Sequence, residues 1–417
     1  MRFVYTLLFY LLLPGIILRL WGKSIKIPAY RKRIAERFGF VPILSQPDNL
    51  WLHAVSLGES IAATPLIKAL LARYPQRKLI ITNMTPTGSS YIAKTFGDQV
   101  INTYVPYDIP LALDRFLNRI KPSLVIMMET ELWPNTFARC AKRNLPIIIA
   151  NARLSERSAK GYAKIAPLVR TMLQQVAIVA AQTKADAERF IALGLDDSKA
   201  KVLGNIKFDL QLPEDLADQA KDLRADWGAR RPIWIAASTH DGEHELVLQA
   251  FTELRRMIPD CLLILVPRHP ERFKFVADLC SKEYSVSLRS QHTRLSADTA
   301  IVIGDTMGEL KLLYAAADIA FVGGSLVPVG GHNLLEPAAV GLPSLTGPYM
   351  HNFVEINALL QQAGVVKTVH NASELANAVC LLLKNETERT HLGATAKQLV
   401  AQNRGAVLKH LEIIDKL

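Results

Sequence analysis

Residues 123–135 read SLVIMMETELWPN, and this stretch contains the step on which the fold depends. From Leu124 to Met128 every residue is apolar, without the alternation of a half-exposed strand. Such a run is typical of a parallel strand that is covered by helices on both faces. Two acids follow it, and Pro134 then marks the start of a helix. The stretch therefore predicts a strand, a polar loop and a helix, which is the repeating unit of an α/β protein.

Apolar runs of similar length recur along the 417 residues, separated by amphipathic stretches. Strands are expected at 50–54, 78–82, 123–128, 146–150, 176–181, 232–237, 261–266, 300–303, 318–322 and 343–346. Two such series predict two Rossmann-like domains facing a cleft, with ligands at the carboxyl ends of the strands. The expected parts are an N-terminal anchor and basic segment, a first Rossmann-like domain, a helical linker and a second Rossmann-like domain, at 1–37, 38–210, 211–231 and 232–417.

The composition excludes several classes of protein. Half of the residues are hydrophobic, which rules out a disordered chain. Four Cys without a CxxC pair rule out a small disulfide scaffold and suit a reducing compartment. The formal charge is +11, but residues 1–37 hold eight basic residues and one acid, so +7 of it is local. A charge that is concentrated in this way does not form a nucleic-acid footprint.

The N-terminal segment combines this basic cluster with an apolar run, Phe3–Leu18. As a helix, the run measures roughly 24 Å at 1.5 Å per residue, slightly less than the ~30 Å core of a bilayer. No small-x-small cleavage site follows it. A short signal-anchor and a helix lying in the membrane interface both remain open, each with the basic residues at the anionic cytoplasmic surface. The alternative is a buried core helix with a solvated basic tail.

Two strand ends and the segment that closes the first half carry candidates for catalysis. HAVSLGE at 53–59 places Glu59 at a helix N-terminus, where the helix dipole favours an ionised carboxylate that can accept a proton. An ordinary first-turn Glu, with Ser56 as a simple cap, is the alternative. Glu129 and Glu131 follow the opening strand, either as functional acids or as a capping cluster. Lys207 either faces an anionic substrate or is a solvated linker residue.

Four successive strand ends in the second half carry polar or glycine-rich loops, and together they predict a nucleotide pocket. Ser238 and Thr239 precede a helix start, where free backbone amides suit a phosphate. Arg268 and His269 lie in a stiff loop between two prolines. Glycines in the third and fourth loops allow a ligand to approach the backbone, and Glu336 is placed to take a ribose diol. Each loop alone is also compatible with a plain turn.

Several well-known motifs are missing from the sequence. There is no GxGxxG fingerprint, no GxxxxGK[ST] loop, no GxSxG elbow and no Asp-x-Asp metal clamp. The simplest interpretation is a transferase that uses neither a metal nor another cofactor.

Together, these segments resemble the 3-deoxy-D-manno-octulosonic acid (Kdo) transferase family of lipopolysaccharide synthesis. The similar segments run in family order over nearly the whole chain: HAVSLGES (53–60), TPTG (85–88), METELWPN (128–135), ANARLSERS (150–158), GNIKFD (204–209), STHDGEHE (238–245), PRHPERF (267–273), GDTMGEL (304–310) and FVGGSLVPVGGHNLLEPAA (321–339). The basic N-terminal anchor is similar too, and no motif position departs from the family pattern.

The resemblance implies a GT-B glycosyltransferase, with CMP-Kdo as donor and a tetraacylated lipid A precursor, lipid IVA, as acceptor. It implies action at the cytoplasmic face of the cell inner membrane, with the first domain on the acceptor side. Glu59 is implied as the proton acceptor, and Glu129 and Lys207 as stabilisers of the transition state. The residues implied to bind CMP are Pro267, Arg268, His269, Met307, Gly308, Glu309, Asn333, Leu334, Leu335 and Glu336.

Two other functions fit the same architecture. A nucleotide-sugar epimerase shares the two domains but has no use for a membrane anchor. A non-catalytic, membrane-associated nucleotide-binding module needs the loops of the second half, but not Glu59, Glu129 and Glu131.

Overall fold

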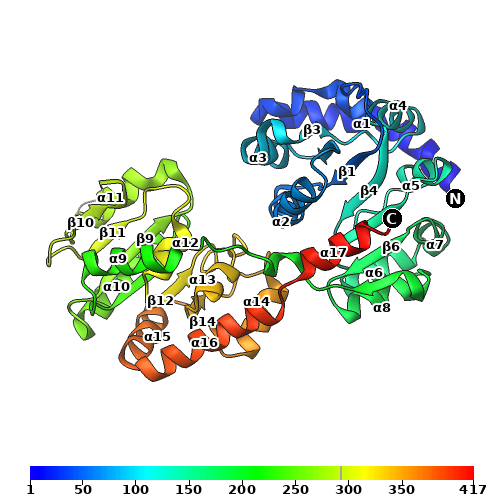
Figure 1. Ribbon diagram of the computed structural model, residues 1–417. Coiled ribbons are helices and arrows are strands. Elements are labelled where there is room, and N and C mark those ends of the chain that lie inside the picture. The colour runs from blue at the N-terminus through cyan, green and yellow to red at the C-terminus, as the bar shows by residue number, and fades with distance from the viewer. Residues whose placement is uncertain (292–293) are drawn as a thin grey trace. The chain divides into compact units, whose positions relative to one another are not determined.

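The computed structural model describes residues 1–291 and 294–417, which form two compact units (Figure 1). Unit 1 comprises Met1–Asp209 and Asn403–Leu417, and unit 2 comprises Leu210–Gln402. Each unit is built on a seven-stranded sheet in which the paired strands are parallel. The predicted α/β fold with two parallel-sheet domains is confirmed.

The sheet of unit 1 has the strand order β3-β2-β1-β4-β5-β6-β7. Its strands are β1 (Asn49–His53), β2 (Leu79–Asn83), β3 (Ile101–Tyr104), β4 (Pro122–Met128), β5 (Ile147–Ala152), β6 (Ile178–Ala181) and β7 (Ala200–Val202). Its helices are α1 (Arg2–Lys26), α2 (Leu57–Arg73), α3 (Pro86–Phe96), α4 (Pro110–Ile120), α5 (Pro134–Lys142), α6 (Glu156–Ala163), α7 (Ala166–Gln174), α8 (Lys184–Ala192) and α17 (Ala406–Ile414).

Both faces of this sheet are covered, which explains why its strands do not alternate in polarity. Trp51 of β1 packs on Phe116 of α4, with ring centroids 4.9 Å apart, in the core on one face. Leu52, the next residue, lies with Leu66 of α2 in the core on the other face.

The sheet of unit 2 has the order β10-β11-β9-β8-β12-β13-β14. Its strands are β8 (Ile233–Thr239), β9 (Leu262–Pro267), β10 (Val286–Leu288), β11 (Ile301–Ile303), β12 (Ile319–Val322), β13 (Ser344–Thr346) and β14 (Val366–Thr368). Its helices are α9 (Leu216–Trp227), α10 (His244–Met257), α11 (Phe273–Cys280), α12 (Leu310–Ala315), α13 (Leu335–Val340), α14 (Val354–Gln362), α15 (Ala372–Lys384) and α16 (Glu386–Gln402).

Each sheet reverses direction at one point. In unit 1 the chain winds one way from β1 to β3 and the other way from β4 to β7, so the reversal lies between β1 and β4. In unit 2 the corresponding reversal lies between β8 and β12. In open α/β sheets, ligands bind outside the carboxyl ends of the strands at this switch point. The fold thus selects the loops after these four strands as candidate sites.

The expected end of the second domain at residue 417 is wrong, because Asn403–Leu417 belongs to unit 1. Ala406, Val407 and Ile414 of α17 are buried in the same core as Leu52. The Asp209 carboxylate accepts a hydrogen bond from Gly405 N at 2.6 Å and fixes the start of α17. The apolar face of α17 therefore completes unit 1 after the chain has left unit 2.

The expected linker at 211–231 is also part of a unit. Its helix, α9, places Leu223 and Trp227 in the core beneath β8 and β9. Arg224 donates both to Ala316 O and to the Asp318 carboxylate, at 3.0–3.1 Å. The segment is thus held against unit 2 and does not act as a free connector.

Helix α1 is longer than the predicted apolar run and is not a buried core helix. It extends over 25 residues, and its most apolar window has a mean hydropathy of 2.0 with none of it buried. By length and composition, it is able to cross a membrane. One face nevertheless packs on unit 1: Phe9, Leu13 and Ile16 contact the buried cluster around Tyr107.

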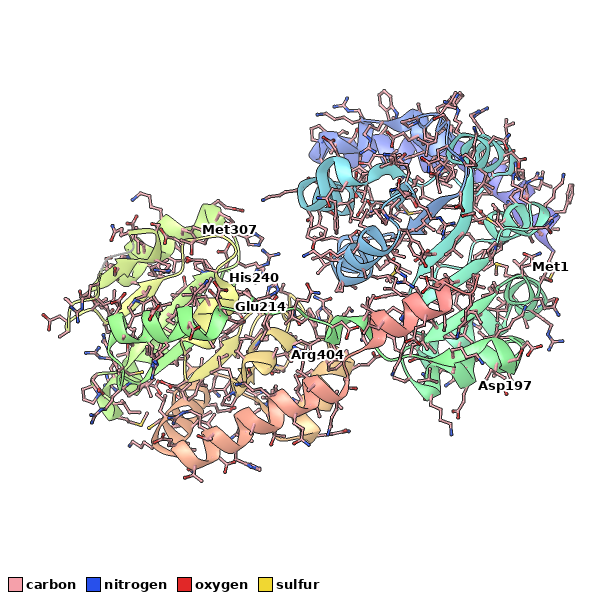
Figure 2. All side chains as sticks on the ribbon, viewed as in Figure 1. Met1, Asp197, Glu214, His240, Met307 and Arg404 are labelled. Carbon is pink, nitrogen blue, oxygen red and sulfur yellow. The ribbon has the colours of Figure 1, made fainter. Side chains whose placement is uncertain are left out.

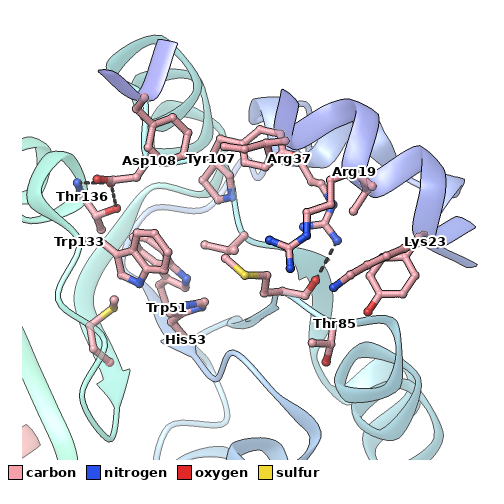
Figure 3. Close-up of a pocket in the computed structure, with 18 residues that line it drawn as sticks. Arg19, Lys23, Arg37, Trp51, His53, Thr85, Tyr107, Asp108, Trp133 and Thr136 are labelled. Atoms are coloured by element: carbon pink, nitrogen blue, oxygen red, sulfur yellow. Dashed lines mark hydrogen bonds between the residues drawn. The ribbon is translucent and has the colours of Figure 1, made fainter. Parts of the chain in front are cut away.

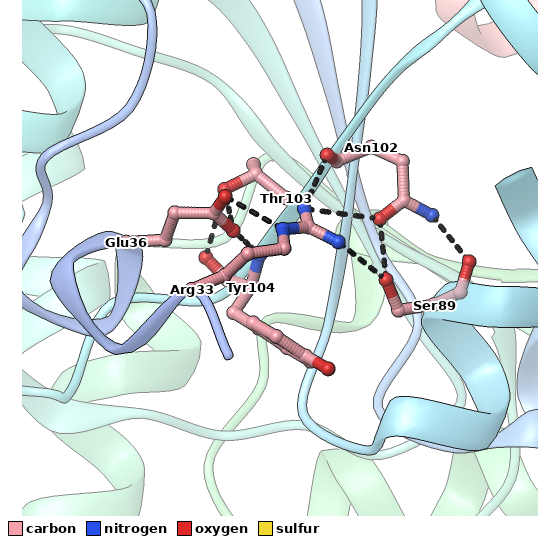
Figure 4. Close-up of polar contacts among 6 residues, drawn as sticks. All are labelled: Arg33, Glu36, Ser89, Asn102, Thr103 and Tyr104. Atoms are coloured by element: carbon pink, nitrogen blue, oxygen red, sulfur yellow. Dashed lines mark hydrogen bonds and ion pairs between the residues drawn. The ribbon is translucent and has the colours of Figure 1, made fainter. Parts of the chain in front are cut away.

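Two members of the expected membrane-facing basic cluster are used inside the fold. Arg33 donates to Glu36 Oε1 at 2.7 Å, to Ser89 Oγ at 2.9 Å and to Asn102 O at 2.6 Å (Figure 4). Arg37 is only 2 % exposed and donates to Met84 O at 2.8 Å. These bonds fasten the segment after α1 to β3 and α3.

Candidate functional site

Glu59 follows β1 at the switch point of unit 1 and belongs to a capping box at the start of α2. Its Oε2 accepts from Val55 N at 2.8 Å, and its Oε1 accepts from Ser56 Oγ at 3.0 Å. Ser56 in turn caps the helix by accepting from Glu59 N. Burial raises the pKa of Glu59 and is opposed mainly by the hydrogen bond from Val55, so burial outweighs the expected stabilisation of the charge.

Glu129 follows β4 on the other side of the same switch point. Its backbone is left-handed, with φ of +55°, a conformation that is uncommon for a residue with a side chain. Its Oε1 lies 3.8 Å from Lys207 Nζ, and both side chains are about a quarter exposed. The structure thus brings together two of the predicted catalytic residues as an ion pair, and Lys207 is not a solvated linker residue.

Glu131 joins this cluster as a third carboxylate; the sequence left open whether it is a functional acid or part of a capping cluster. Its Oε2 accepts from Trp133 Nε1 at 2.8 Å. Burial, followed by the negative charge of Glu59, raises the pKa of Glu131 to about 7. A carboxyl group with this pKa can exchange a proton near neutral pH.

Glu243 organises the switch point of unit 2, and sequence reasoning missed it. The residue is fully buried, and its two carboxylate oxygens accept four backbone N–H bonds, from His240, Gly324, Ser325 and Leu326, at 2.6–3.0 Å. They tie the loop after β8 to the loop after β12. Gly323 makes this approach possible, because a Cβ there would lie 2.8 Å from Ser238 O. Only its place in the STHDGEHE segment distinguished this acid from an ordinary helix-start residue.

Three histidines converge above these loops; His240 is labelled in Figure 2. His240 Nε2 and His332 Nε2 are 2.8 Å apart, so that one ring donates and the other accepts. The ring of His269 is 5.2 Å from that of His240. Burial lowers the pKa of His332 to about 4, which keeps it neutral near pH 7. Sequence reasoning named His269 but did not assign the other two, although STHD and GGHN contain them.

The predicted phosphate and CMP residues of the first two loops lie beside this cluster. Ser238 is left-handed, with φ of +57°, and Thr239 O accepts from Arg268 N at 2.9 Å. This bond joins the ends of β8 and β9. Pro267 is buried, whereas Arg268 is exposed and its charge helps to lower the pKa of His240 and His332.

The other two predicted loops differ in what they offer a ligand. Met307, also labelled in Figure 2, is 67 % exposed, and Gly308 has φ of +90°. Glu309 accepts from Arg289 Nη2 at 2.8 Å, so its carboxylate is already engaged.

The segment Asn333–Glu336 is more constrained than expected. The side chains of Leu334 and Leu335 are fully buried, so these residues can meet a ligand only through the backbone. Asn333 Oδ1 accepts from Leu335 N at 3.1 Å. Burial raises the pKa of Glu336, opposed mainly by the charge of Lys311.

Within residues 1–291 and 294–417, no three His, Cys, Asp or Glu side chains form a group that could hold a metal ion. The four cysteines are buried and free. The groups that this arrangement offers for chemistry are carboxylates, cations and backbone amides.

Two family models match the chain, largely one for each unit. A family model described as 3-deoxy-D-manno-octulosonic-acid transferase matches residues 32–210, and one described as glycosyl transferases group 1 matches residues 233–399. The chain is 44% identical to a 3-deoxy-D-manno-octulosonic acid transferase of Haemophilus influenzae, over 99% of this chain and 98% of that one. It is 33% identical to the transferase of Bordetella pertussis, over 99% of each chain.

Among solved structures, a UDP-GlcNAc 2-epimerase from Neisseria meningitidis is similar over 88% of this chain and 100% of its own, with a TM-score of 0.58. The sequence identity is 14%, so this likeness concerns the fold alone.

Proposed function

This chain belongs to the Kdo transferase family of glycosyltransferases, and we propose that it transfers Kdo from CMP-Kdo to lipid IVA, a lipid A precursor, with inversion at the anomeric carbon and without a metal ion. The observation that carries the proposal is the carboxylate cluster of unit 1, in which the half-buried Glu59 lies near Glu129 and its partner Lys207. A passive nucleotide-binding module has no need of this cluster, and an epimerase has no use for the exposed apolar helix α1.

Glu59 is the proposed general base. Its carboxylate takes the proton of the acceptor hydroxyl as that oxygen forms a bond to the anomeric carbon of Kdo and the bond from this carbon to the CMP phosphate breaks. The electron pair of the broken bond leaves with CMP. A pKa raised by burial brings a carboxylate closer to the operating pH, where general bases act best. A single displacement inverts the anomeric centre and needs only one base.

Glu129 and Lys207 are proposed to stabilise the transition state. Lys207 supplies positive charge, and Glu129 holds its ammonium group in place at 3.8 Å. In unit 2 we propose that CMP is held by the loops after β8, β9 and β11 and by the start of α13, through the residues predicted from the sequence. Arg268 and the backbone amides of these loops supply the positive potential for the departing phosphate. Because these hydrogen-bond donors belong to the chain itself, no metal ion is needed to supply the positive potential, which supports metal independence.

We propose that α1 attaches the protein to the cytoplasmic face of the inner membrane while lying in the interface. One side of α1 packs on unit 1 through Phe9 and Ile16, whereas Leu11 and Leu18 on other sides are 68 % and 73 % exposed. A helix attached along its length in this way is suited to an in-plane position, with its free apolar side in the lipid. Arg31 and Lys32, both exposed, follow it and favour an anionic surface.

The purified protein incubated with CMP-Kdo tests the proposal. We expect CMP to be released only when lipid IVA is present, the lipid to gain the mass of Kdo, and EDTA to leave the rate unchanged. A donor that changes without the lipid would favour the epimerase, and a donor that binds but never changes would favour the passive module. Loss of the reaction in EDTA, restored by a divalent ion, would contradict metal independence.

A further inference from the structure

Unit 1 contains a cavity of about 330 Å³ beneath α1 (Figure 3), a volume within the usual range of ligand pockets, about 300–1,000 Å³. Its walls come from the inner side of α1 and from the carboxyl ends of the central strands. The apolar lining includes Phe9, Ile16, Leu20, Trp51, Met127 and Trp133. Neither the sequence patterns nor the proposed chemistry uses this space.

Three buried polar side chains line the same cavity with an atom that has no hydrogen-bond partner in the described part of the chain. These atoms are Arg37 Nε, His53 Nε2 and Tyr107 Oη, in residues that are 2 %, 0 % and 8 % exposed. Buried polar atoms are normally satisfied, and one left without a partner is destabilising. Polar atoms of this kind inside a cavity indicate a polar ligand group.

The charged side chains that line the cavity favour an anionic ligand group. Arg37 points into it, with exposed Arg19 and Lys23 of α1 at its edge (Figure 3). Asp108, the acid in the lining, is already bonded to Asn135 N, Thr136 N and Thr136 Oγ1 at 2.7–2.9 Å. Asp108 therefore does not neutralise the cations, and the apolar side chains named above form much of the rest of the wall. A phosphate attached to an acyl chain has both properties.

The cavity shares a wall with the carboxylate cluster. Trp133 lines the cavity and donates through Nε1 to Glu131 at 2.8 Å. His53, another lining residue, is separated by one residue from Val55, whose N–H binds Glu59. A molecule held in the cavity is thus close to the proposed base, which favours the acceptor over a bystander lipid.

We propose that the cavity under α1 binds the acceptor itself, with one acyl chain along the apolar wall and a phosphate of the same molecule on Arg37, Arg19 and Lys23. This inference rests on the proposed function, since it names the site at which the phosphorylated, acylated acceptor is held. Helix α1 then has two sides with different tasks: the outer side faces the membrane, and the inner side faces the substrate.

The first experiment fills the cavity. Ile16→Trp places a large side chain inside it, and Leu11→Trp places the same side chain on the exposed side of α1 as a matched control. The probe is dodecyl phosphate, titrated by calorimetry below its micellar concentration into the full-length protein. We expect Ile16→Trp to weaken binding by at least about tenfold, the equivalent of about two buried methylenes. The same variant should raise the KM for lipid IVA while kcat and the affinity for CMP stay unchanged. Leu11→Trp should change none of these.

The second experiment tests the phosphate half without touching a buried residue. The double variant Arg19→Gln with Lys23→Gln should weaken dodecyl phosphate but leave the neutral amphiphile dodecyl maltoside unaffected. Equal losses for the two probes, or wild-type binding by Ile16→Trp, would overturn the proposal. So would a short-chain phosphatidylglycerol that displaces dodecyl phosphate when lipid IVA does not, because the cavity would then be a phospholipid site. If the wild type binds dodecyl phosphate as expected but forms no Kdo-lipid, the proposed function fails and not the amphiphile site.

Discussion

The switch points of the two units share the same strand arrangement but use their acidic residues differently. In each unit a strand next to the reversal ends in a left-handed residue, Glu129 after β4 and Ser238 in β8. In unit 1 the loops present carboxylates that remain partly exposed and have a raised pKa. In unit 2 the acid, Glu243, is fully buried and is consumed by four backbone amides. The fold determines where a ligand can bind, and the burial of one acid determines whether that place is reactive or structural.

Glu59→Gln should have the largest effect of the substitutions considered, and it should affect the chemistry of unit 1 alone. The amide retains the length of the side chain but cannot accept a proton, so kcat should fall by about 10²- to 10⁴-fold. CMP affinity should hardly change, because the proposed CMP loops belong to unit 2. Steady-state kinetics and CMP titration on one preparation measure both. Glu188→Gln, an exposed acid on α8 of the same unit, is the matched control. If Glu59→Gln retained more than about a tenth of wild-type kcat, Glu131 or Glu129 would be the better candidate for the base.

Acidic pH should lower the stability of both units, since each has a neutral histidine, the fully buried His53 or the partly buried His332, whose pKa burial lowers to about 4. Below pH ~6.5 the unfolded chain takes up protons that the folded unit refuses, so stability falls as the pH drops from 6.5 towards 4. The loss per histidine is at most roughly 3 kcal/mol. His332→Asn should reduce the loss for unit 2 only, measured by urea unfolding at pH 7.5 and 5. Identical pH dependence in the variant and the wild type would contradict this assignment.

Glu243→Gln tests whether the buried acid of unit 2 is structural. An amide nitrogen replaces one acceptor oxygen, so at least one buried N–H loses its partner, at a cost of about 1–3 kcal/mol in the free energy of unfolding. CMP binding should weaken as the two loops separate, while the pH dependence of turnover set by Glu59 should not move. Asp241→Asn, an exposed neighbour, is the control. Unchanged unfolding with lost turnover would instead make Glu243 a participant in the reaction.

Glu336→Ala should have the smallest effect of the four. The lost contact to the donor is present in the ground state and the transition state alike, so KM for CMP-Kdo should rise and kcat should hold. One hydrogen bond to a charged group, about 1.5 kcal/mol, corresponds to a rise of about tenfold. Glu271→Ala, exposed in the same unit, provides the baseline. An unchanged donor KM would remove Glu336 from the pocket.

The sequence predicted the middle of each sheet but not its edges. All ten expected strands are present, and the four that were missed, β3, β7, β10 and β14, are the two outer strands of each sheet. β7 is largely exposed, and β10 is only partly buried along its length. An edge strand has a partner on one side only and needs no continuous apolar run, so it leaves little periodicity to detect.

The site followed the same rule. Glu59, Glu129 and the four loops of unit 2 follow strands with strong patterns, and the structure places them at the expected strand ends. Lys207 follows β7, one of the strands that were missed, and was found from its position near the end of the first half. Glu243 and the cavity under α1 could not be found in this way. Their roles arise from contacts between segments far apart in sequence, such as Glu243 with Gly324 or α1 with Tyr107.

The return of α17 to unit 1 has a consequence for how the protein is made. Unit 2 is an insertion between Asp209 and Asn403, so the ribosome delivers the whole of it before α17 appears. Until then the core around Leu52 lacks Ala406, Val407 and Ile414, and α2, which carries Glu59, lacks a neighbour. Because domains generally fold as they emerge, unit 2 can mature while unit 1 still lacks α17. With the roles proposed above, a nascent chain would hold nucleotide before it can activate a hydroxyl, and catalysis would be delayed until α17 has emerged.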